Sequence, residues 1–148
     1  MKTIIPVIFA VILFPSCTSG PGGVNDAGLA PCPERPNCVS SQAAADDGVH
    51  RIEPFDYSGH TMEKARLAVL EVLEAQDLTE ILVREEHYIH ALFRTPAMRF
   101  KDDVEFYFPA DEPVIHIRSA SRLGYSDGGT NRRRVEHLRA EWRKLMEI

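Results

Sequence analysis

The spacing of apolar residues predicts two helices, one near the middle of the chain and one near its C-terminal end. Apolar positions recur at a helical interval over residues 62–75, and Thr61 or Ser58 can cap the start of this helix. A second helical stripe covers about residues 131–146. Its apolar positions are Val135, Leu138, Trp142 and Leu145. Both stripes are typical of helices that pack one face against a core.

Between the two helices the apolar period changes to two, which is typical of strands. Residues 80–86, 88–95, 101–108 and 114–121 are expected to form four strands. Their short connections favour antiparallel neighbours. The sequence therefore predicts an α+β fold: a two-layer α-β-β-β-β-α sandwich, with a four-stranded antiparallel sheet and both helices on one face.

The strand alternation also predicts a polar face on the side of the sheet away from the helices. The side chains expected there are His90, Arg94, Asp103, Glu105, His116 and Arg118. Cross-strand neighbours lie about 5 Å apart, so these groups can pair. Two interpretations stay open: a solvated face with matched charges, or a polar pocket roofed by the proline-rich segment before the first helix. In the second, the carboxylates and histidines could bind a metal or move a proton.

The segment before the last helix is the most polar stretch of the chain. A turn at residues 126–129 is followed by Thr130 or Asn131, either of which can cap the helix. Arg132, Arg133 and Arg134 then occupy the first turn, where positive charge opposes the helix dipole. We expect an offset, either from internal partners, namely Asp102, Asp103 or Asp127, or from a small anion bound at the helix start.

The first residues have the order of a secretory signal peptide, with a positive Lys2, an apolar run over residues 4–14 and a small-residue exit by residue 16. The run is too short to span a bilayer, which takes about 20 residues. Residues 13–17 resemble a bacterial lipobox that ends at Cys17, although Phe14 and Pro15 depart from its usual pattern. Lipidation of Cys17 is the favoured interpretation, and cleavage near Ser19 or Gly20 that releases a soluble periplasmic protein is the alternative.

The cysteine count agrees with export. If Cys17 carries lipid, Cys32 and Cys38 remain as a pair in an oxidising compartment. The prolines between them favour a tight loop that a disulfide can close. A metal or redox pair and two free thiols remain alternatives, although the spacing is not that of a Cys-x-x-Cys metal site. We thus expect a signal peptide at 1–16, a tether at 17–29 and a single domain at 30–148.

The charge distribution argues against a nucleic-acid partner. Residues 18–115 carry 8 basic and 18 acidic groups, a net of −10, whereas residues 116–148 carry 8 basic and 4 acidic groups, a net of +4. The acidic body repels phosphate. For catalysis by a nucleophile there is also no support, because the serines lack a Gly-x-Ser-x-Gly setting and no phosphate-binding loop of the Walker type is present.

Several motifs resemble those of a known family. They are Pro31-Cys-Pro-Glu-Arg-Pro-Asn-Cys-Val-Ser-Ser-Gln42, Phe100-Lys-Asp-Asp-Val-Glu-Phe106, Arg118-Ser-Ala-Ser-Arg-Leu-Gly-Tyr-Ser-Asp127 and Asn131-Arg-Arg-Arg-Val-Glu136. Together they resemble the domain of unknown function 1499 family over about residues 30–142. The resemblance implies no particular reaction or cofactor, but bacterial relatives are often envelope proteins or lipoproteins. With His116, the motifs supply these candidate ligand-binding residues: Asp102, Asp103, Glu105, His116, Arg118, Arg122, Asp127, Asn131, Arg132 and Arg134.

Three hypotheses about function follow. The first is a non-enzymatic lipoprotein of the cell envelope, anchored to a membrane and facing the periplasm or exterior, whose domain binds a small ligand or an envelope protein. The second is an enzyme of unknown reaction. Its polar site would consist of Asp102, Asp103, Glu105, His116 and Arg118. The third is a structural accessory subunit.

Overall fold

The computed structural model describes residues 23–147. The predicted signal peptide, Cys17 and the first part of the predicted tether lie outside these residues. The described elements are β1 (Val24–Asn25), β2 (Gly28–Leu29), β3 (Cys38–Ser40), β4 (Phe55–Asp56), α1 (Met62–Glu74), β5 (Thr79–Arg84), β6 (Tyr88–Arg94), β7 (Lys101–Tyr107), β8 (Val114–Ser121) and α2 (Thr130–Met146).

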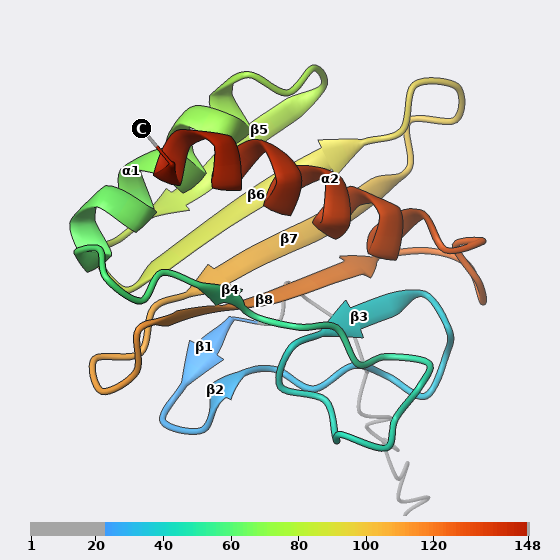
Figure 1. Ribbon diagram of the computed structural model, residues 1–148. Helices are drawn as coiled ribbons and strands as arrows, with labels where there is room; N and C mark the ends of the chain where they lie inside the picture. Colours follow the sequence, from blue (N-terminus) through green and yellow to red (C-terminus); the bar gives the residue numbers. More distant parts are fainter. Residues whose placement is uncertain (1–22, 148) are drawn as a thin grey trace, which may run out of the picture.

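One antiparallel sheet in the order β3-β8-β7-β6-β5 forms the centre of the domain, and α1 and α2 lie side by side over one of its faces (Figure 1). The predicted α+β class, the two helices and the four long strands are confirmed. The predicted count of four strands is wrong, because the sheet has six strands and β1 and β2 form a separate two-stranded sheet.

The two additional strands share one edge of the sheet. β3 pairs with Arg118–Ala120 of β8, and β4 pairs with Val114 and Ile115 at the other end of the same strand. Both are only two or three residues long and lie in the proline-rich segment, so neither shows a period of two. Their pairing comes from contacts far along the chain, which a local pattern does not report.

The two helices begin differently. As predicted, Thr61 caps α1, and its hydroxyl accepts a hydrogen bond from the backbone N–H of Lys64 at 3.2 Å. The prediction that Thr130 or Asn131 caps α2 is wrong. The Asp127 carboxylate accepts the N–H groups of Gly129 at 2.9 Å and Asn131 at 2.7 Å, because two successive glycines with positive φ turn the chain back over the helix start.

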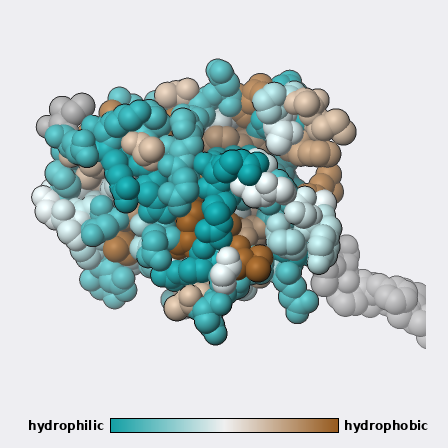
Figure 2. All heavy atoms as spheres, turned by 45° about the vertical axis from the view of Figure 1, so that its right-hand side comes forward, coloured by the Kyte–Doolittle hydropathy of each residue, from teal (hydrophilic) through white to brown (hydrophobic). Residues whose placement is uncertain are grey.

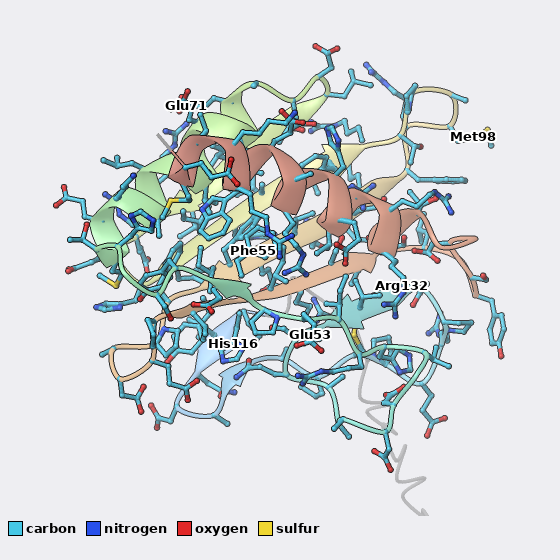
Figure 3. All side chains as sticks on the ribbon, in the orientation of Figure 1. Glu53, Phe55, Glu71, Met98, His116 and Arg132 are labelled. Atoms are coloured by element: carbon cyan, nitrogen blue, oxygen red, sulfur yellow. A yellow bond between two sulfur atoms is a disulfide. The ribbon has the colours of Figure 1, made fainter. Side chains whose placement is uncertain are left out.

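The core lies between the helices and the sheet. Phe55 of β4 sits beneath α2 (Figure 3), with its ring centroid 5.2 Å from Trp142 and 6.2 Å from Phe106. Trp142 also donates its indole N–H to the Ala65 carbonyl of α1 at 3.1 Å, so it joins both helices. The predicted alternation of β7 is confirmed, since Val104 and Phe106 are buried in this core.

β5 is the outer strand on the far side of the sheet and pairs only with β6. Its register shifts between Ile81 and Val83, where a bulge interrupts the ladder. Charged side chains flank the bulge: Arg84 pairs with Glu74 of α1 at 2.6 Å, and Glu80 pairs with Arg94 of β6 at 2.8 Å.

Cys32 and Cys38 form a disulfide, which confirms the pairing favoured from the sequence. The bond closes the loop that carries Asn37, whose backbone carbonyl accepts the N–H of Ser121 at the end of β8 at 2.9 Å. The disulfide thus holds this loop against the sheet edge beside β3. Within residues 23–147, no helix has the length and apolar character needed to cross a membrane.

Replacing both Cys32 and Cys38 with Ser should lower the free energy of unfolding by about 2 kcal/mol, because the open loop gains chain entropy in the unfolded state. Chemical denaturation of the oxidised protein measures this. A reductant should lower the wild-type stability to that of the double variant and leave the variant unchanged. A wild-type protein that keeps its stability after reduction of the bond would contradict the prediction.

Candidate functional site

A buried polar network lies on the face of the sheet away from the helices, centred on Glu105 of β7. The Glu105 side chain is fully buried and accepts hydrogen bonds from the Tyr88 hydroxyl at 2.7 Å and from Arg118 Nη1 at 2.6 Å. The backbone N–H of Gly23 is a third donor, at 2.7 Å. Burial, followed by the hydrogen bond to Glu105, raises the pKa of the Tyr88 hydroxyl.

Asp103, two residues earlier on the same face, forms the second half of this network. It accepts one hydrogen bond from His90 Nε2 at 2.8 Å and two from the Arg122 guanidinium, at 2.8 and 2.9 Å. Burial raises the pKa of Asp103, but the hydrogen bonds from His90 and Arg122 outweigh it and lower the pKa to about 2. The carboxylate therefore stays ionised at neutral pH.

This far-face network, formed by Tyr88, His90, Asp103, Glu105, Arg118 and Arg122, differs from both interpretations of the sequence. Its charges are matched across the strands, but they are buried rather than solvated. The cover is the segment before β3, because β2 packs on β7 and β8 and buries Leu29 there. Internal partners thus occupy the carboxylates of the network, which favours a structural role, although Arg118 Nε is buried without a hydrogen-bond partner among residues 23–147.

Three candidates from the sequence lie outside the far-face network. His116, which is labelled in Figure 3, contacts Ser41 through a 3.0 Å hydrogen bond and stacks on Tyr107, and burial lowers the pKa of the imidazole. Arg94 pairs with Glu80 at the sheet edge. The expectation that Asp102 joins Asp103 and Glu105 is wrong, because successive residues of β7 point to opposite faces and Asp102 faces α2.

A second polar cluster joins the start of α2 to the sheet, and Asn131 is its centre. This fully buried side chain donates through Nδ2 to the Asn37 carbonyl at 3.0 Å, Ser121 Oγ at 3.0 Å and Asp127 Oδ2 at 2.7 Å. Its Oδ1 accepts from Ser119 at 2.6 Å. Segments that are far apart in the sequence therefore meet at this one amide.

Protein groups hold all three arginines of the first turn of α2. Arg134 donates to Asp102 Oδ2 at 2.5 Å and to Asn131 Oδ1 at 2.7 Å. Arg132, labelled at the start of α2 in Figure 3, donates to the backbone carbonyl of Val49, and Arg133 donates to that of Gly128. The helix start thus has internal partners, the first of the two alternatives given by the sequence, although Asp102 is the only one of the expected acids that pairs with these arginines.

Beside this cluster a cavity of about 240 Å³ opens between the β6–β7 loop and the β8–α2 loop. We call it the loop-end cavity; it is lined by Thr95, Phe100, Asp102, Ser121, Leu123, Gly124, Ser126, Asp127 and Thr130. Phe100 and Leu123 are 45% and 68% exposed, and Met98 stands at the tip of the β6–β7 loop (Figure 3). Figure 2, which turns this side forward, shows hydrophobic side chains exposed at its upper right on a largely hydrophilic surface.

Asp102 is the buried polar residue of the cavity lining. The residue is 2% exposed, and its Oδ2 atom accepts the bond from Arg134. Its Oδ1 atom accepts no hydrogen bond from any residue in the range 23–147. Among residues 23–147 the fully buried side-chain atoms that lack a hydrogen-bond partner are Asn37 Oδ1 and Arg118 Nε, so Asp102 Oδ1 is open to the cavity and not sealed in the interior.

The structure brings the sequence candidates into two groups on opposite faces of the sheet. The far-face network contains Asp103, Glu105, Arg118 and Arg122, and the cluster at α2 contains Asp102, Asp127, Asn131 and Arg134.

The sequence analysis missed two residues of these clusters, Asn37 and Tyr88. The strand alternation could have shown Tyr88, which lies two residues before His90, whereas the role of Asn37 depends on contacts far along the chain. No group of three potential metal-ligating side chains occurs among residues 23–147.

Comparison with known proteins identifies the family of the chain. Residues 28–142 match the family model described as a protein of unknown function, DUF1499. The match covers most of the chain, so the chain belongs to the DUF1499 family. No curated protein and no solved structure shows significant similarity to it. The residues of both polar clusters lie within the matched region, and their ligand-binding role stays a prediction.

The Asp103 pKa predicts an acid-dependent loss of stability. Because the folded-state pKa of about 2 lies below the unfolded value of 3.8, ionised Asp103 stabilises the fold by about 2 kcal/mol above pH 4, and this stabilisation is lost as the pH falls toward 2. The gap in melting temperature between the wild type and Asp103→Asn should therefore shrink over this range.

The same substitution at exposed Asp111 is the control and should give a small gap at every pH. A gap for Asp103→Asn that stays constant between pH 5 and pH 2 would count against the assignment of the acid transition to this carboxylate.

Proposed function

We propose that the protein is an exported protein of the cell envelope that binds a small ligand in the loop-end cavity. The observation that carries this proposal is the loop-end cavity itself, where Asp102 Oδ1 accepts no hydrogen bond from residues 23–147 and exposed Phe100 and Leu123 flank the opening. A few polar groups that converge on an apolar-edged hollow are the usual composition of a ligand site.

The surrounding structure supports binding because it holds the cavity floor in place. Arg134 contacts Asp102, Asn131 and Ser119 and lies 5.0 Å above the Phe93 ring, so it cannot swing away from the carboxylate without losing several contacts. The apolar flanks come from the β6–β7 and β8–α2 loops, whereas Asp102 and Ser121 come from β7 and β8. A polar floor held by the sheet below apolar flanks favours recognition of a small molecule.

The residues of the cavity fit binding without chemical conversion better than they fit catalysis. The cavity lining offers four hydroxyl groups, from Thr95, Ser121, Ser126 and Thr130, but no histidine, lysine or cysteine. A hydroxyl nucleophile needs an adjacent base to be activated. The far-face network has carboxylates and a histidine, but these groups are buried in pairs with each other and with arginines.

Export and a lipid anchor at Cys17 are part of the same proposal. Their support is the order of charged, apolar and small residues at the start of the chain, together with the lipobox-like segment. The disulfide between Cys32 and Cys38 is typical of an oxidising compartment, and Cys17 is the remaining cysteine of the sequence.

Native mass spectrometry of the full chain, released gently from membranes of its own source, tests the binding proposal. We expect a bound small molecule that is mostly lost in Leu123→Glu, because a charge at the rim opposes entry of an apolar group. Leu67→Glu is the matched control, since Leu67 is 51% exposed on α1 and does not line the cavity. Absence of any bound molecule, or equal retention in both variants, would overturn the proposal.

Cys17→Ser tests the anchor. The variant should move from the membrane fraction to the soluble fraction, because the thiol that would carry the lipid is gone. The double variant Cys32→Ser/Cys38→Ser should stay with the membrane, as it keeps Cys17 and loses only the disulfide. Fractionation followed by immunoblotting measures both, and a Cys17→Ser protein that remains membrane-bound would refute lipidation.

A further inference from the structure

We propose that the loop end of the domain docks on the surface of an anionic phospholipid bilayer, with the tips of two loops inserted among the lipid headgroups. The loop end is the end of the sheet from which the β6–β7 loop (residues 95–100) and the β8–α2 loop (residues 122–129) project (Figure 1). The inference rests on the export and anchoring part of the proposed function, and it adds the orientation of the domain at the membrane.

Both loops expose large apolar side chains. The three most exposed large hydrophobic residues among residues 23–147 lie in these loops: Met98, Leu123 and Tyr125. Phe100 is also exposed and lies in the same loop as Met98, which stands at the tip (Figure 3). Exposed apolar side chains that gather on a hydrophilic surface mark a site of contact with a partner or a membrane.

Backbone hydrogen bonds hold the two loops side by side. Thr95 and Phe100 close the β6–β7 loop, since the Thr95 N–H donates to the Phe100 carbonyl at 2.9 Å and the Phe100 N–H donates to Thr95 Oγ1 at 3.0 Å. At the base of the loops, the Arg122 N–H donates to the Lys101 carbonyl at 3.0 Å. The apolar tips are thus presented together, and a preformed surface loses less conformational entropy when it docks.

The charges at the two ends of the sheet favour the loop end for an anionic surface. Arg99 and Lys101 are exposed there, and Arg122 is close by in an ion pair with a buried carboxylate. The acidic residue of these loops, Asp127, is occupied as the cap of α2. The loops at the opposite end of the sheet contain four carboxylates: Glu85, Glu86, Asp111 and Glu112. An anionic bilayer therefore attracts the loop end and repels the opposite end.

A lipid anchor at Cys17 would keep the domain at the bilayer. Gly23 is attached to the far-face network by its hydrogen bond to Glu105 at 2.7 Å. The six residues from Cys17 to Gly23 span at most about 20 Å. Phe100 lies five residues from Glu105 in the direction of β7, which corresponds to about 17 Å. The anchor can therefore reach the plane of the loop tips; it can also reach the opposite end, so charge and apolar character select between the two.

The residue types of the loop tips fit a headgroup layer. Tyrosine is enriched at the interface between membrane and water, and arginine and lysine are attracted to anionic lipids. Apolar side chains at such an interface lie about 5–10 Å into the boundary between headgroups and acyl chains. The loop-end cavity, which lies between the two loops, would then open toward the headgroups.

Tryptophan fluorescence in vesicles that contain brominated phospholipids tests the docking. The full chain is reconstituted in vesicles of phosphatidylglycerol and phosphatidylcholine as the variant Tyr125→Trp or, as the matched control, Leu67→Trp on α1. The buried Trp142 gives the same background in both. We expect bromine to quench the Tyr125→Trp variant about threefold more than the control, because the loop tip reaches the acyl boundary and α1 does not.

Charge variants test the role of the anionic lipid. Adding Arg99→Gln/Lys101→Gln should reduce the quenching of the Tyr125→Trp variant about twofold. Glu85→Gln/Glu86→Gln, at the opposite end of the sheet, should leave it unchanged. None of the substituted residues lines the loop-end cavity, so retention of its ligand should not change.

Three results would overturn the docking proposal. They are equal quenching of the Tyr125→Trp and Leu67→Trp variants, quenching that does not depend on Arg99 and Lys101, and a chain that stays off the vesicles. Quenching that appears only after membrane proteins are added to the vesicles would point to a protein partner and would also overturn it. Fractionation of Cys17→Ser and the native mass measurement decide the anchor and the bound ligand separately.

Discussion

The buried amide of Asn131 is the constraint on which the rest of the structure depends. Its hydrogen bonds link the disulfide loop, the end of β8 and the turn before α2, so they fix where the last helix meets the sheet. The position of α2 then determines where Trp142 enters the core and where Arg134 meets Asp102. A side chain of this kind is effective because Asn131 and its partners Asn37 and Ser119 are buried, so moving the amide would break hydrogen bonds that water does not readily replace.

Strand β7 contributes to both polar clusters, because two successive residues of this strand belong to different clusters. Asp102 faces α2 and Asp103 faces the covered far side, although they are neighbours in the chain. The sheet is consequently buried on both faces, which a sheet with helices on only one side does not require. The N-terminal segment provides the second cover, and Gly23 reaches Glu105 directly. That arrangement explains why ionisable side chains can be fully enclosed in so small a domain.

Local periodicity was sufficient to predict the two helices and the four long strands, because each presents a repeated apolar face. It could not predict β3 and β4, which are too short to alternate and depend on the edge of β8. The sequence identified most residues of the two polar clusters as candidates, but it did not show which of them lie together in the fold. Asp127 was expected as an ion-pair partner and instead caps the helix, and the buried state of Glu105 depends on a segment more than 70 residues away. Such groupings are properties of tertiary contact, not of residue type.

The bulge in the outer strand β5 lowers the tendency of this protein to pair edge to edge with other copies of itself. An open strand edge can extend its ladder into a neighbouring chain, which is a common route to aggregation. The shift between Ile81 and Val83 breaks the regular row of donors and acceptors, and the charged Glu80 and Arg84 flank it. At the opposite edge, β3 and β4 are too short to offer a long template. Both edges of the sheet therefore oppose strand pairing between neighbouring copies of the protein, even at high local concentration.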